Sequence, residues 1–147
     1  MRNDEDWYIS LEGASIWDVY DSLSGIFRGG GNQTSPKLVK QSGLRERDFT
    51  FWTDEKTGTK YVLPDVRTGL SFSDSIERLA NLRPRPLRGY VWKIPKGTAF
   101  PSGLCVNYDK REVDHPMVGP AYRMTVDEFT AKLKLLAGSM VPTNKKF

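Results

Sequence analysis

The stretch "KYVLPDVRTGLSFSDSIERL", residues 60–79, decides the fold because it changes from one backbone pattern to another. It opens with a short apolar run, passes through a turn around Pro64 and Gly69, and ends with apolar residues at helical spacing. Ser and Asp side chains accept hydrogen bonds from the unpaired N–H groups at a helix start, and the same groups attract phosphate. The stretch therefore predicts a strand and a capped helix, with or without an anionic ligand at the hydroxyls of Ser71, Ser73 and Ser75.

Patterns on either side of this stretch predict both strands and helices. Apolar and β-branched residues predict a hairpin whose turn ends in Thr57-Gly58, and further strands at 7–11, 25–29, 88–95, 104–108 and 116–124. Helical spacing predicts helices near 15–24, 73–82 and 125–137. Capping boxes are expected at Asp74 with Glu77 and at Thr125 with Glu128. Strands dominate the middle without a strand–helix–strand repeat, so the predicted class is α+β and mostly antiparallel.

A glycine run and a polar segment interrupt these patterns. Gly29, Gly30 and Gly31 follow Arg28, and consecutive glycines are unfavourable inside a regular element, so we expect a loop or a close approach to a ligand there. The polar segment from Asn32 to Asp48 predicts a long surface loop, and loops of this length are often functional or mobile.

Length and charge set the general class of the protein. With 147 residues, 38% hydrophobic and 27% charged, the chain suits one domain, 1–147, with a single core. Lys and Arg total 22 against 18 Asp and Glu, and the net charge of +4 is a mild bias toward anionic partners such as nucleotides. No basic run exceeds the terminal "NKK", so the sequence gives no sign of a nucleic-acid-binding stripe.

Several kinds of chemistry are excluded by residue type. One cysteine, Cys105, excludes an internal disulfide, and one cysteine with one histidine, His115, is too few for the usual zinc site, so we expect no metal. No segment has the ~20 apolar residues of a membrane span, and the acidic start lacks the pattern of a signal peptide, so we expect a cytoplasmic protein. Phosphate-loop, dinucleotide and serine-hydrolase motifs are missing from the sequence.

Three segments in order resemble a known toxin family. These are "GIFRG", "YVLPDVRTGLSFSD" and "VWKIPKGTAFPSGLCVNYDKREVDHPMVGPAYRM", followed by an amphipathic helix. Together they resemble the second type-six-exported toxin family of bacterial secretion systems, whose fold is like that of NAD-dependent ADP-ribosyltransferase toxins. The resemblance covers residues 23–137. Its most specific parts are the pattern of Pro64, Asp65, Gly69 and Ser71 and the block from Ile94 to Pro101.

The resemblance implies an architecture and a cofactor. It implies an α+β, ADP-ribosyltransferase-like fold, with antiparallel sheets around a central cleft and flanking helices. The expected division is an N-terminal strand and helix extension over 1–22, a core over 23–137 and a flexible tail over 138–147. The expected cofactor is NAD, and the expected activity is ADP-ribosyl transfer or another NAD-consuming reaction.

The resemblance also implies which residues bind NAD. Arg28 matches the first-strand arginine that supports the dinucleotide, and its planar fork suits diphosphate oxygens. Ser71 matches the hydroxyl that braces the site, and Phe72 is the candidate to stack on nicotinamide. The remaining expected cofactor-binding residues are Gly29, Ser73 and Asp74. The alternatives are a surface arginine at Arg28, simple helix caps at the serines and Asp74, and a core or loop role for the rest.

The third motif departs from the better-known transferases. They place a Glu late in the fold to stabilise the cationic ribose, and Glu112 is the loosely placed candidate. The toxin family carries a histidine near this point, which His115 matches, and a histidine there is expected to hold a ribose hydroxyl or remove a proton. The alternative for His115 is a loop histidine without a role. The departure leaves open whether the acceptor is protein, nucleic acid or water.

Three classes of function follow. The first is an NAD-utilising toxin of the ADP-ribosyltransferase type that acts in the cytoplasm and inhibits growth of target cells, either as an effector secreted by a type VI system or as a chromosomal toxin. A cognate immunity protein or antitoxin is expected to mask it at a basic cleft rim. The second is a metal-independent ribonuclease-like toxin using His115, Tyr108, Lys110 and Arg111. The third is a binding module without catalysis.

Overall fold

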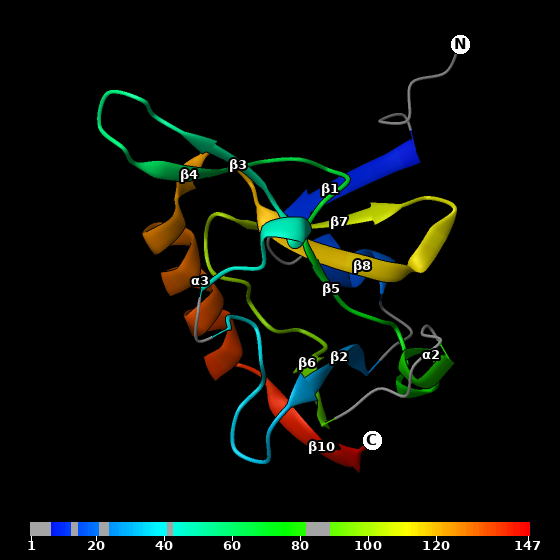
Figure 1. Cartoon of the computed structure of the whole chain (residues 1–147). Helices are drawn as coiled ribbons and strands as arrows, with labels where there is room; N and C mark the ends of the chain where they lie inside the picture. Colours follow the sequence, from blue (N-terminus) through cyan, green and yellow to red (C-terminus); the bar gives the residue numbers. More distant parts are fainter. Residues whose placement is uncertain (1–6, 13–14, 21–23, 41–42, 82–88) are drawn as a thin grey trace.

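Ten strands and few helices build the described part of the protein, which is a computed structural model covering residues 7–12, 15–20, 24–40, 43–81 and 89–147 (Figure 1). The helices are α1 (Ile16–Val19), α2 (Ile76–Asn81) and α3 (Val126–Gly138), with a 3₁₀ turn, η3 (Glu46–Asp48). The strands are β1 (Tyr8–Glu12), β2 (Gly25–Gly31), β3 (Thr50–Thr53), β4 (Lys60–Leu63), β5 (Leu70–Ser71), β6 (Tyr90–Pro95), β7 (Leu104–Asp109), β8 (Glu112–Pro120), β9 (Met124–Thr125) and β10 (Val141–Lys146).

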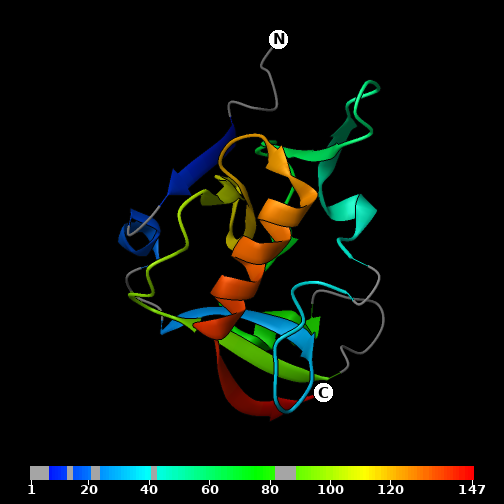
Figure 2. The same cartoon turned by 90° about the vertical axis from the view of Figure 1, so that its left-hand side faces the viewer.

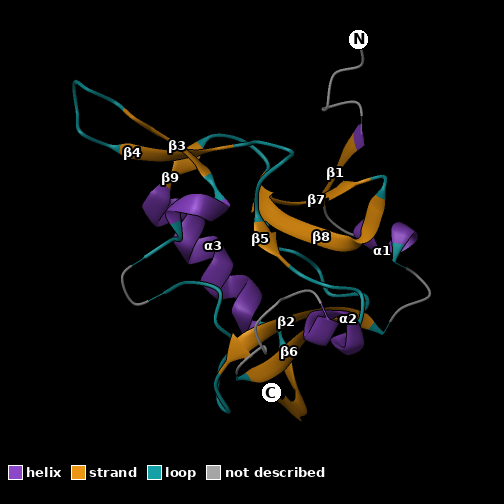
Figure 3. Ribbon diagram, turned by 45° about the vertical axis from the view of Figure 1, so that its right-hand side comes forward, coloured by secondary structure: helices purple, strands orange, loops and turns teal. Residues whose placement is uncertain are grey.

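The strands form three antiparallel sheets (Figure 3). The four-stranded sheet has the order β1-β7-β8-β5, the lower sheet β10-β6-β2, and the hairpin sheet β3-β4-β9. In Figure 1 the four-stranded sheet lies above the lower sheet, and the hairpin sheet projects at the upper left. The predicted α+β class with mostly antiparallel strands is confirmed.

The core lies between the sheets and under α3, which runs from the hairpin sheet to the lower sheet (Figure 2). Phe129, Leu133 and Leu136 recur at helical spacing and are fully buried, because this stripe faces the sheets. Burying each such side chain contributes about 1.5–3 kcal/mol. Thr125 caps the helix, since its hydroxyl accepts a 3.1 Å hydrogen bond from the N–H of Glu128. The predicted third helix and its Thr125 cap are confirmed.

The second helix begins later than predicted. The N–H of Asp74 donates to the carbonyl of Asp114 at 3.2 Å, so Asp74 still belongs to the strand ladder. Ser75 is the cap instead, because its hydroxyl accepts a hydrogen bond from the N–H of Arg78 at 3.1 Å. The predicted Asp74–Glu77 capping box is therefore wrong. α2 packs on the lower sheet through a small cluster of Leu79 with Phe27 and Val91.

Two segments are more ordered than the sequence indicates. Gly29, Gly30 and Gly31 belong to β2, where the register to β6 shifts between Arg28 and Gly31. Such a bulge accommodates glycines inside a strand, so the expectation that they lie outside a regular element is wrong. The segment 32–40 is attached to the lower sheet, since the indole of Trp92 donates to the carbonyl of Asn32 at 2.9 Å and Arg28 donates to the carbonyl of Lys37 at 3.1 Å. Leu38 in this segment is buried.

The C-terminal segment is a strand and not a flexible tail. β10 pairs with β6, with Val141 opposite Lys93 and Pro142 opposite Trp92. The N–H of Phe147 donates to the carbonyl of Gly89 at 2.8 Å, which fastens the end of the chain. The expectation of a flexible tail over 138–147 is therefore wrong. The edge of β6 opposite β2 has backbone groups that need partners, and β10 provides them.

The N-terminal segment agrees better with the expectation of a strand and a short helix. β1 adds an edge to the four-stranded sheet by pairing with β7. The helix predicted near 15–24 is shorter, since α1 ends at Val19 and β2 begins at Gly25; residues 21–23 lie outside the described part. No described helix is long and apolar enough to cross a membrane.

Candidate functional site

The segment 70–74 lies between β8 and β2 and joins the two larger sheets. On one side the N–H of Phe72 donates to the carbonyl of Pro116 at 2.8 Å, in the ladder of β5 with β8. On the other side Phe27 and Ser73 exchange two hydrogen bonds of 2.8 Å. Residues 70–74, within the stretch 60–79, thus form the seam between the sheets.

Arg28 lies at this seam and contacts two neighbouring segments. Its Nη1 donates to the carbonyl of Ser71 at 2.8 Å, and its Nε donates to the carbonyl of Lys37 at 3.1 Å. The side chain is half-buried and Ser71 is exposed. Two residues 43 positions apart in the sequence are therefore brought together. Gly29 is the next residue of β2 after Arg28, and it is also half-buried.

The serines at the seam differ in exposure. Ser71 is exposed, whereas Ser73 is 0% exposed and its hydroxyl accepts from the N–H of Ser75 at a long 3.4 Å. Ser75 caps α2. The three hydroxyls at this junction therefore have different environments. Those of Ser73 and Ser75 accept backbone hydrogen bonds at the start of α2, and Ser71 is exposed at the surface.

Phe72 does not have the expected orientation. Its side chain is 1% exposed and belongs to the main core cluster with Leu70 and Val118. A ring that is covered by core side chains has no free face for nicotinamide, so the expected stacking role is corrected to a packing role. The alternation of side chains along a strand explains this, because Ser71 and Phe72 must point to opposite faces.

His115 is on the strand that faces the serines. Leu70 pairs with Val118 and Ser71 with Met117, and continuing this register sets Ser73 opposite His115. Opposite residues of an antiparallel pair project to the same face, so His115 shares a face with Ser71 and Ser73. His115 is half-buried and lies within β8, so it is a strand residue and not a loop residue.

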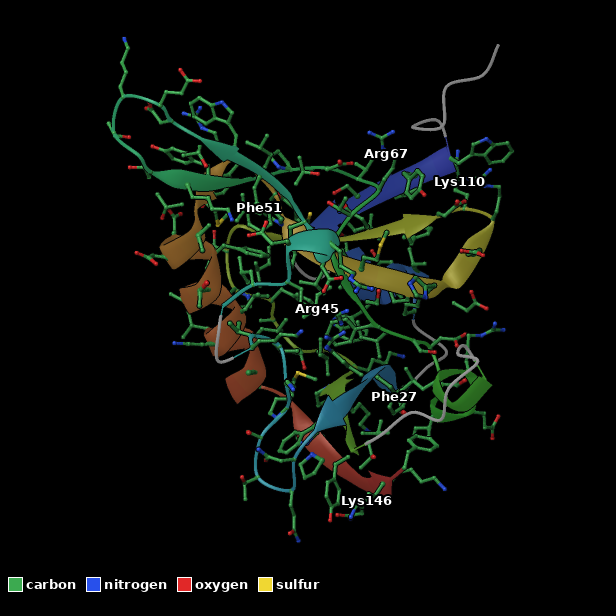
Figure 4. All side chains as sticks on the ribbon, in the orientation of Figure 1. Phe27, Arg45, Phe51, Arg67, Lys110 and Lys146 are labelled. Carbon is green, nitrogen blue, oxygen red and sulfur yellow. The ribbon has the colours of Figure 1, made fainter. Side chains whose placement is uncertain are left out.

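Glu112 and the residues of the ribonuclease alternative lie toward the turn between β7 and β8. Glu112 is exposed and pairs across the turn with Asp109, beyond the point where the register of β7 with β8 shifts. Arg111 binds the carboxylate of Asp109, with Nη2 and Oδ2 2.6 Å apart. Figure 4 shows Lys110 on this turn, far from Phe27 on β2. Glu112 thus lies at the turn end of β8, and His115 lies further along the same strand.

A network that sequence patterns do not indicate braces β8 beside His115. Arg78 of α2 lies 2.6 Å from the carboxylate of Asp114 and 3.7 Å from that of Asp74. The hydroxyl of Tyr20 donates to the carbonyl of Val113 at 2.8 Å. Burial raises the pKa of Tyr20 well above its ordinary value, and Tyr108, Asp74 and Asp114 raise it further. The only signal for this network was the i,i+4 spacing of Asp74 and Arg78.

The most specific sequence pattern has a structural role. The carboxylate of Asp65 accepts from the hydroxyl of Thr50 at 2.9 Å and from the N–H of Arg67 at 3.0 Å. Gly69 has φ +146°, and a Cβ there would come within 2.9 Å of the side chain of Met117. Only a glycine permits so close an approach of β5 to β8. Asp65 and Gly69 therefore help to set the position of Ser71.

The second pattern, Ile94 to Pro101, is a turn after β6. The hydroxyl of Thr98 donates to the carbonyl of Pro95 at 2.6 Å, and Gly97 has φ +87°. The indole of Trp17 donates to the carbonyl of Thr98 at 2.9 Å, which attaches α1 to the turn. The block therefore fixes the path from the lower sheet to β7.

The donor set at the seam suits an anionic, hydroxyl-bearing ligand such as NAD. A guanidinium provides planar N–H donors for phosphate, and a hydroxyl and an imidazole exchange hydrogen bonds with ribose. Among the described residues no group of three or more His, Cys, Asp or Glu side chains is placed to hold a metal ion. Arg28, Ser71 and His115 are of residue types that suit a dinucleotide, whereas the side chains of Phe72 and Ser73 are buried.

Comparison with known proteins identifies the family. The sequence model of one family, described as Tse2 ADP-ribosyltransferase toxin, matches residues 25–143. No curated protein and no solved structure matches the chain. The matched residues run from the first residue of β2 into β10 and include the whole seam. Because the match covers well over half of the 147 residues, the chain belongs to the Tse2 family of ADP-ribosyltransferase toxins.

Proposed function

We propose that this ADP-ribosyltransferase toxin binds NAD at the seam of β2, β5 and β8, with Arg28, Ser71 and His115 as the residues that contact it. The observation that carries the proposal is the 2.8 Å hydrogen bond from Arg28 to the carbonyl of Ser71. It brings together the two residues that match the first and second motifs of the family. The register of β8 adds His115 on the face of Ser71.

The reaction defines what these residues must do. The bond between nicotinamide and ribose breaks, nicotinamide leaves, and a nucleophile of the acceptor bonds to the ribose carbon and gives up a proton. Arg28 is suited to hold a diphosphate, since a guanidinium offers paired N–H groups to phosphate oxygens. Ser71 supports the ribose with its hydroxyl. Holding the dinucleotide in one geometry lowers the barrier by reducing the entropy lost at the reaction step.

His115 is assigned the acid/base role. An imidazole accepts the proton of the attacking group or holds a ribose hydroxyl, and positioned acid/base groups accelerate reactions by about 10²–10⁴-fold. Glu112 has no role in this proposal, because it lies exposed at the turn end of β8. Gly29 and Asp74 are assigned no contact with NAD in this proposal.

The test separates binding from chemistry. Calorimetry measures NAD binding to wild type, Arg28→Gln and His115→Ala, and released nicotinamide measures turnover. We expect Arg28→Gln to weaken binding and His115→Ala to slow turnover with little change in binding. Unchanged NAD binding and turnover in both variants would contradict the site.

We also propose how the toxin meets its partners. A toxin of this family endangers the cell that makes it, which supports a cognate immunity protein that covers the exposed edge of Arg28 and Ser71. Delivery by a type VI system into the cytoplasm of a target cell is proposed from the same family membership. Coexpression with small neighbouring open reading frames tests the first point, and a lack of protection by all of them would count against it.

The strands outside residues 23–137 support treating 1–147 as one catalytic unit. β1 completes the four-stranded sheet and β10 completes the lower sheet, so each sheet at the seam depends on a terminal segment. Removing residues 1–22 or 139–147 is therefore expected to lower stability and activity together, as circular dichroism and nicotinamide release would measure.

A further inference from the structure

The outer face of the hairpin sheet carries an exposed cluster that the NAD site does not use. Trp52 of β3 and Tyr61 of β4 are directly opposite each other, with ring centroids 5.6 Å apart. Arg123, which precedes β9, lies over both rings, 4.9 Å from Tyr61 and 5.5 Å from Trp52. Trp52 is 44% exposed, which is unusual for so large an apolar side chain. We name these three residues the aromatic–arginine patch.

The other face of the same sheet explains why the patch is at the surface. Phe51, Val62 and Met124 pair across the three strands and point toward the core and α3. Strand alternation then forces Trp52 and Tyr61 outward. The fold therefore has no need of aromatic residues at these two positions, where polar side chains would serve a solvent-exposed face equally well.

Arg123 is a cation without a carboxylate partner in the described part of the chain. Lys60 of the same sheet, by contrast, is paired with Glu46. Arg123 is exposed and contacts only the two rings, so it forms no ion pair or hydrogen bond with the described residues. Stacking on aromatic faces leaves the edge of a guanidinium able to bind a carboxylate through two parallel hydrogen bonds.

We propose that the aromatic–arginine patch docks the protein acceptor of ADP-ribose, with a carboxylate of the acceptor bound by Arg123 and an apolar side chain packed on Trp52. The proposal rests on the ADP-ribosyltransferase activity, which needs an acceptor of ADP-ribose beside NAD. Trp, Tyr and Arg are the residue types that contribute most to protein interfaces. The hairpin projects from the body (Figures 1 and 2), so a large partner reaches it without a clash with the sheets.

The charges around the patch favour a protein over a nucleic acid. Exposed Glu55 lies in the hairpin turn, and exposed Asp127 and Glu128 follow Arg123 at the start of α3. Nucleic acids require a basic path along the phosphates, and these three carboxylates interrupt it. An acceptor protein complements these charges if it has one carboxylate to bind Arg123 and lysines or arginines around that carboxylate to face the acidic residues of the toxin.

The experiment compares transfer to acceptor with binding of NAD. Purified wild type and the variants Trp52→Ala, Arg123→Glu and Arg123→Lys are incubated with labelled NAD and bacterial lysate. NAD binding is measured by calorimetry without lysate. Lys134→Ala and Leu135→Ala remove an exposed charge and an exposed apolar side chain elsewhere on α3, and serve as matched controls.

We expect the initial rate of protein labelling to fall at least about tenfold in Trp52→Ala and Arg123→Glu, because a few Trp, Tyr and Arg residues contribute most of the binding free energy of a protein interface. Arg123→Lys keeps the charge but loses the bidentate geometry and is expected to lie between these variants and wild type. NAD affinity and labelling by the two controls are expected to stay at wild-type values.

Three outcomes would overturn the proposal. One is unchanged labelling in the patch variants. Another is a fall of NAD affinity by the same factor as labelling, which would mean that the changes disturb the fold. The third is label that survives protease and is removed by nuclease, which would mean a nucleic-acid acceptor. NAD binding is measured without lysate. If the proposed NAD site is wrong, this shows in variants of that site, whereas the patch variants change only the labelling of protein.

Discussion

Arg28 donates a 2.8 Å hydrogen bond to the main-chain carbonyl of Ser71, and this bond joins β2 of the lower sheet to β5 of the four-stranded sheet. The acceptor is a backbone atom, so the contact depends on the path of the chain and not on the serine hydroxyl. A residue with a proposed role in NAD binding thus also holds the two sheets together.

The Arg28→Lys variant separates these two roles. Lysine keeps the positive charge but lacks the fork that reaches both Ser71 and Lys37. We expect the free energy of unfolding to fall by about 1–2 kcal/mol, since hydrogen bonds from charged groups contribute about 1.5–3 kcal/mol and this side chain is only half-buried. NAD affinity is expected to fall about tenfold or more, because lysine cannot form the two parallel hydrogen bonds that the Arg28 guanidinium offers to the diphosphate of NAD. Urea unfolding and calorimetry measure the two quantities, and wild-type NAD affinity in Arg28→Lys would remove Arg28 from the site.

His115→Ala is expected to lower ADP-ribosyl transfer by about 10²-fold or more, because a positioned acid/base group contributes at least that factor. The side chain is half-buried at a strand position and is not part of either core cluster, so the unfolding free energy should change by only about 0.5–1 kcal/mol. Thermal melting beside a transfer assay distinguishes the two effects. Full activity in a well-folded His115→Ala protein would leave the chemistry to Arg28 and Ser71.

The sequence predicted those parts of the fold that local patterns determine. The β3–β4 hairpin and α3 follow from alternation, a turn at Gly58 and a capped apolar stripe, and each is confirmed. β10 and the glycines of β2 were missed, because their strand conformation comes from pairing with β6 and not from their own residue types. Tertiary pairing overrides weak local preference in both cases.

The candidate site was predictable only in part, and for a related reason. Arg28 and Ser71 were found by family pattern, and their proximity depends on a hydrogen bond to a backbone carbonyl that no pattern encodes. The inward orientation of Phe72 follows from strand alternation once β5 is known to pair with β8. Arg78 was missed because its partner Asp114 is distant in sequence.

Phe72→Ala tests the packing role of this ring. The ring is 1% exposed and lies among core side chains, so its removal leaves a cavity. We expect the unfolding free energy to fall by about 3–5 kcal/mol, as for other buried Phe→Ala changes. Urea denaturation followed by tryptophan fluorescence measures this loss. A stability close to wild type together with lost NAD binding would instead support the stacking role.

The pair of Arg78 and Asp114 is expected to position β8 beside His115. Arg78→Ala, Asp114→Ala and the double variant form a cycle whose coupling should be about 0.2–1 kcal/mol, because both side chains are partly exposed and screened. If the pair positions His115, kcat falls in both single variants while NAD affinity stays near wild type. Equal loss of stability with unchanged kcat would assign the pair to stability alone.

Tyr20 gives the protein a specific response to alkaline pH. Its pKa is raised in the folded state by burial and by the neighbouring Tyr108, Asp74 and Asp114, so folding favours the neutral hydroxyl. A group whose pKa is higher in the folded state contributes stability that is fully present below its unfolded value, about 10 for tyrosine, and that is lost as pH rises above it. Tyr20→Phe keeps the ring but removes the ionisable hydroxyl and its bond to Val113.

We therefore expect Tyr20→Phe to be slightly less stable than wild type at pH 8, by about 0.5–1.5 kcal/mol for the lost hydrogen bond. From about pH 10 upward the free energy of unfolding of wild type should fall more steeply than that of the variant. The reason is that the Tyr20 hydroxyl ionises more readily in the unfolded chain than in the folded protein, whereas phenylalanine cannot ionise. Urea unfolding at pH 8, 10 and 11 measures both curves, and other titrating groups cancel in the difference. Parallel curves over this range would mean that the Tyr20 hydroxyl does not titrate differently in the folded and unfolded protein.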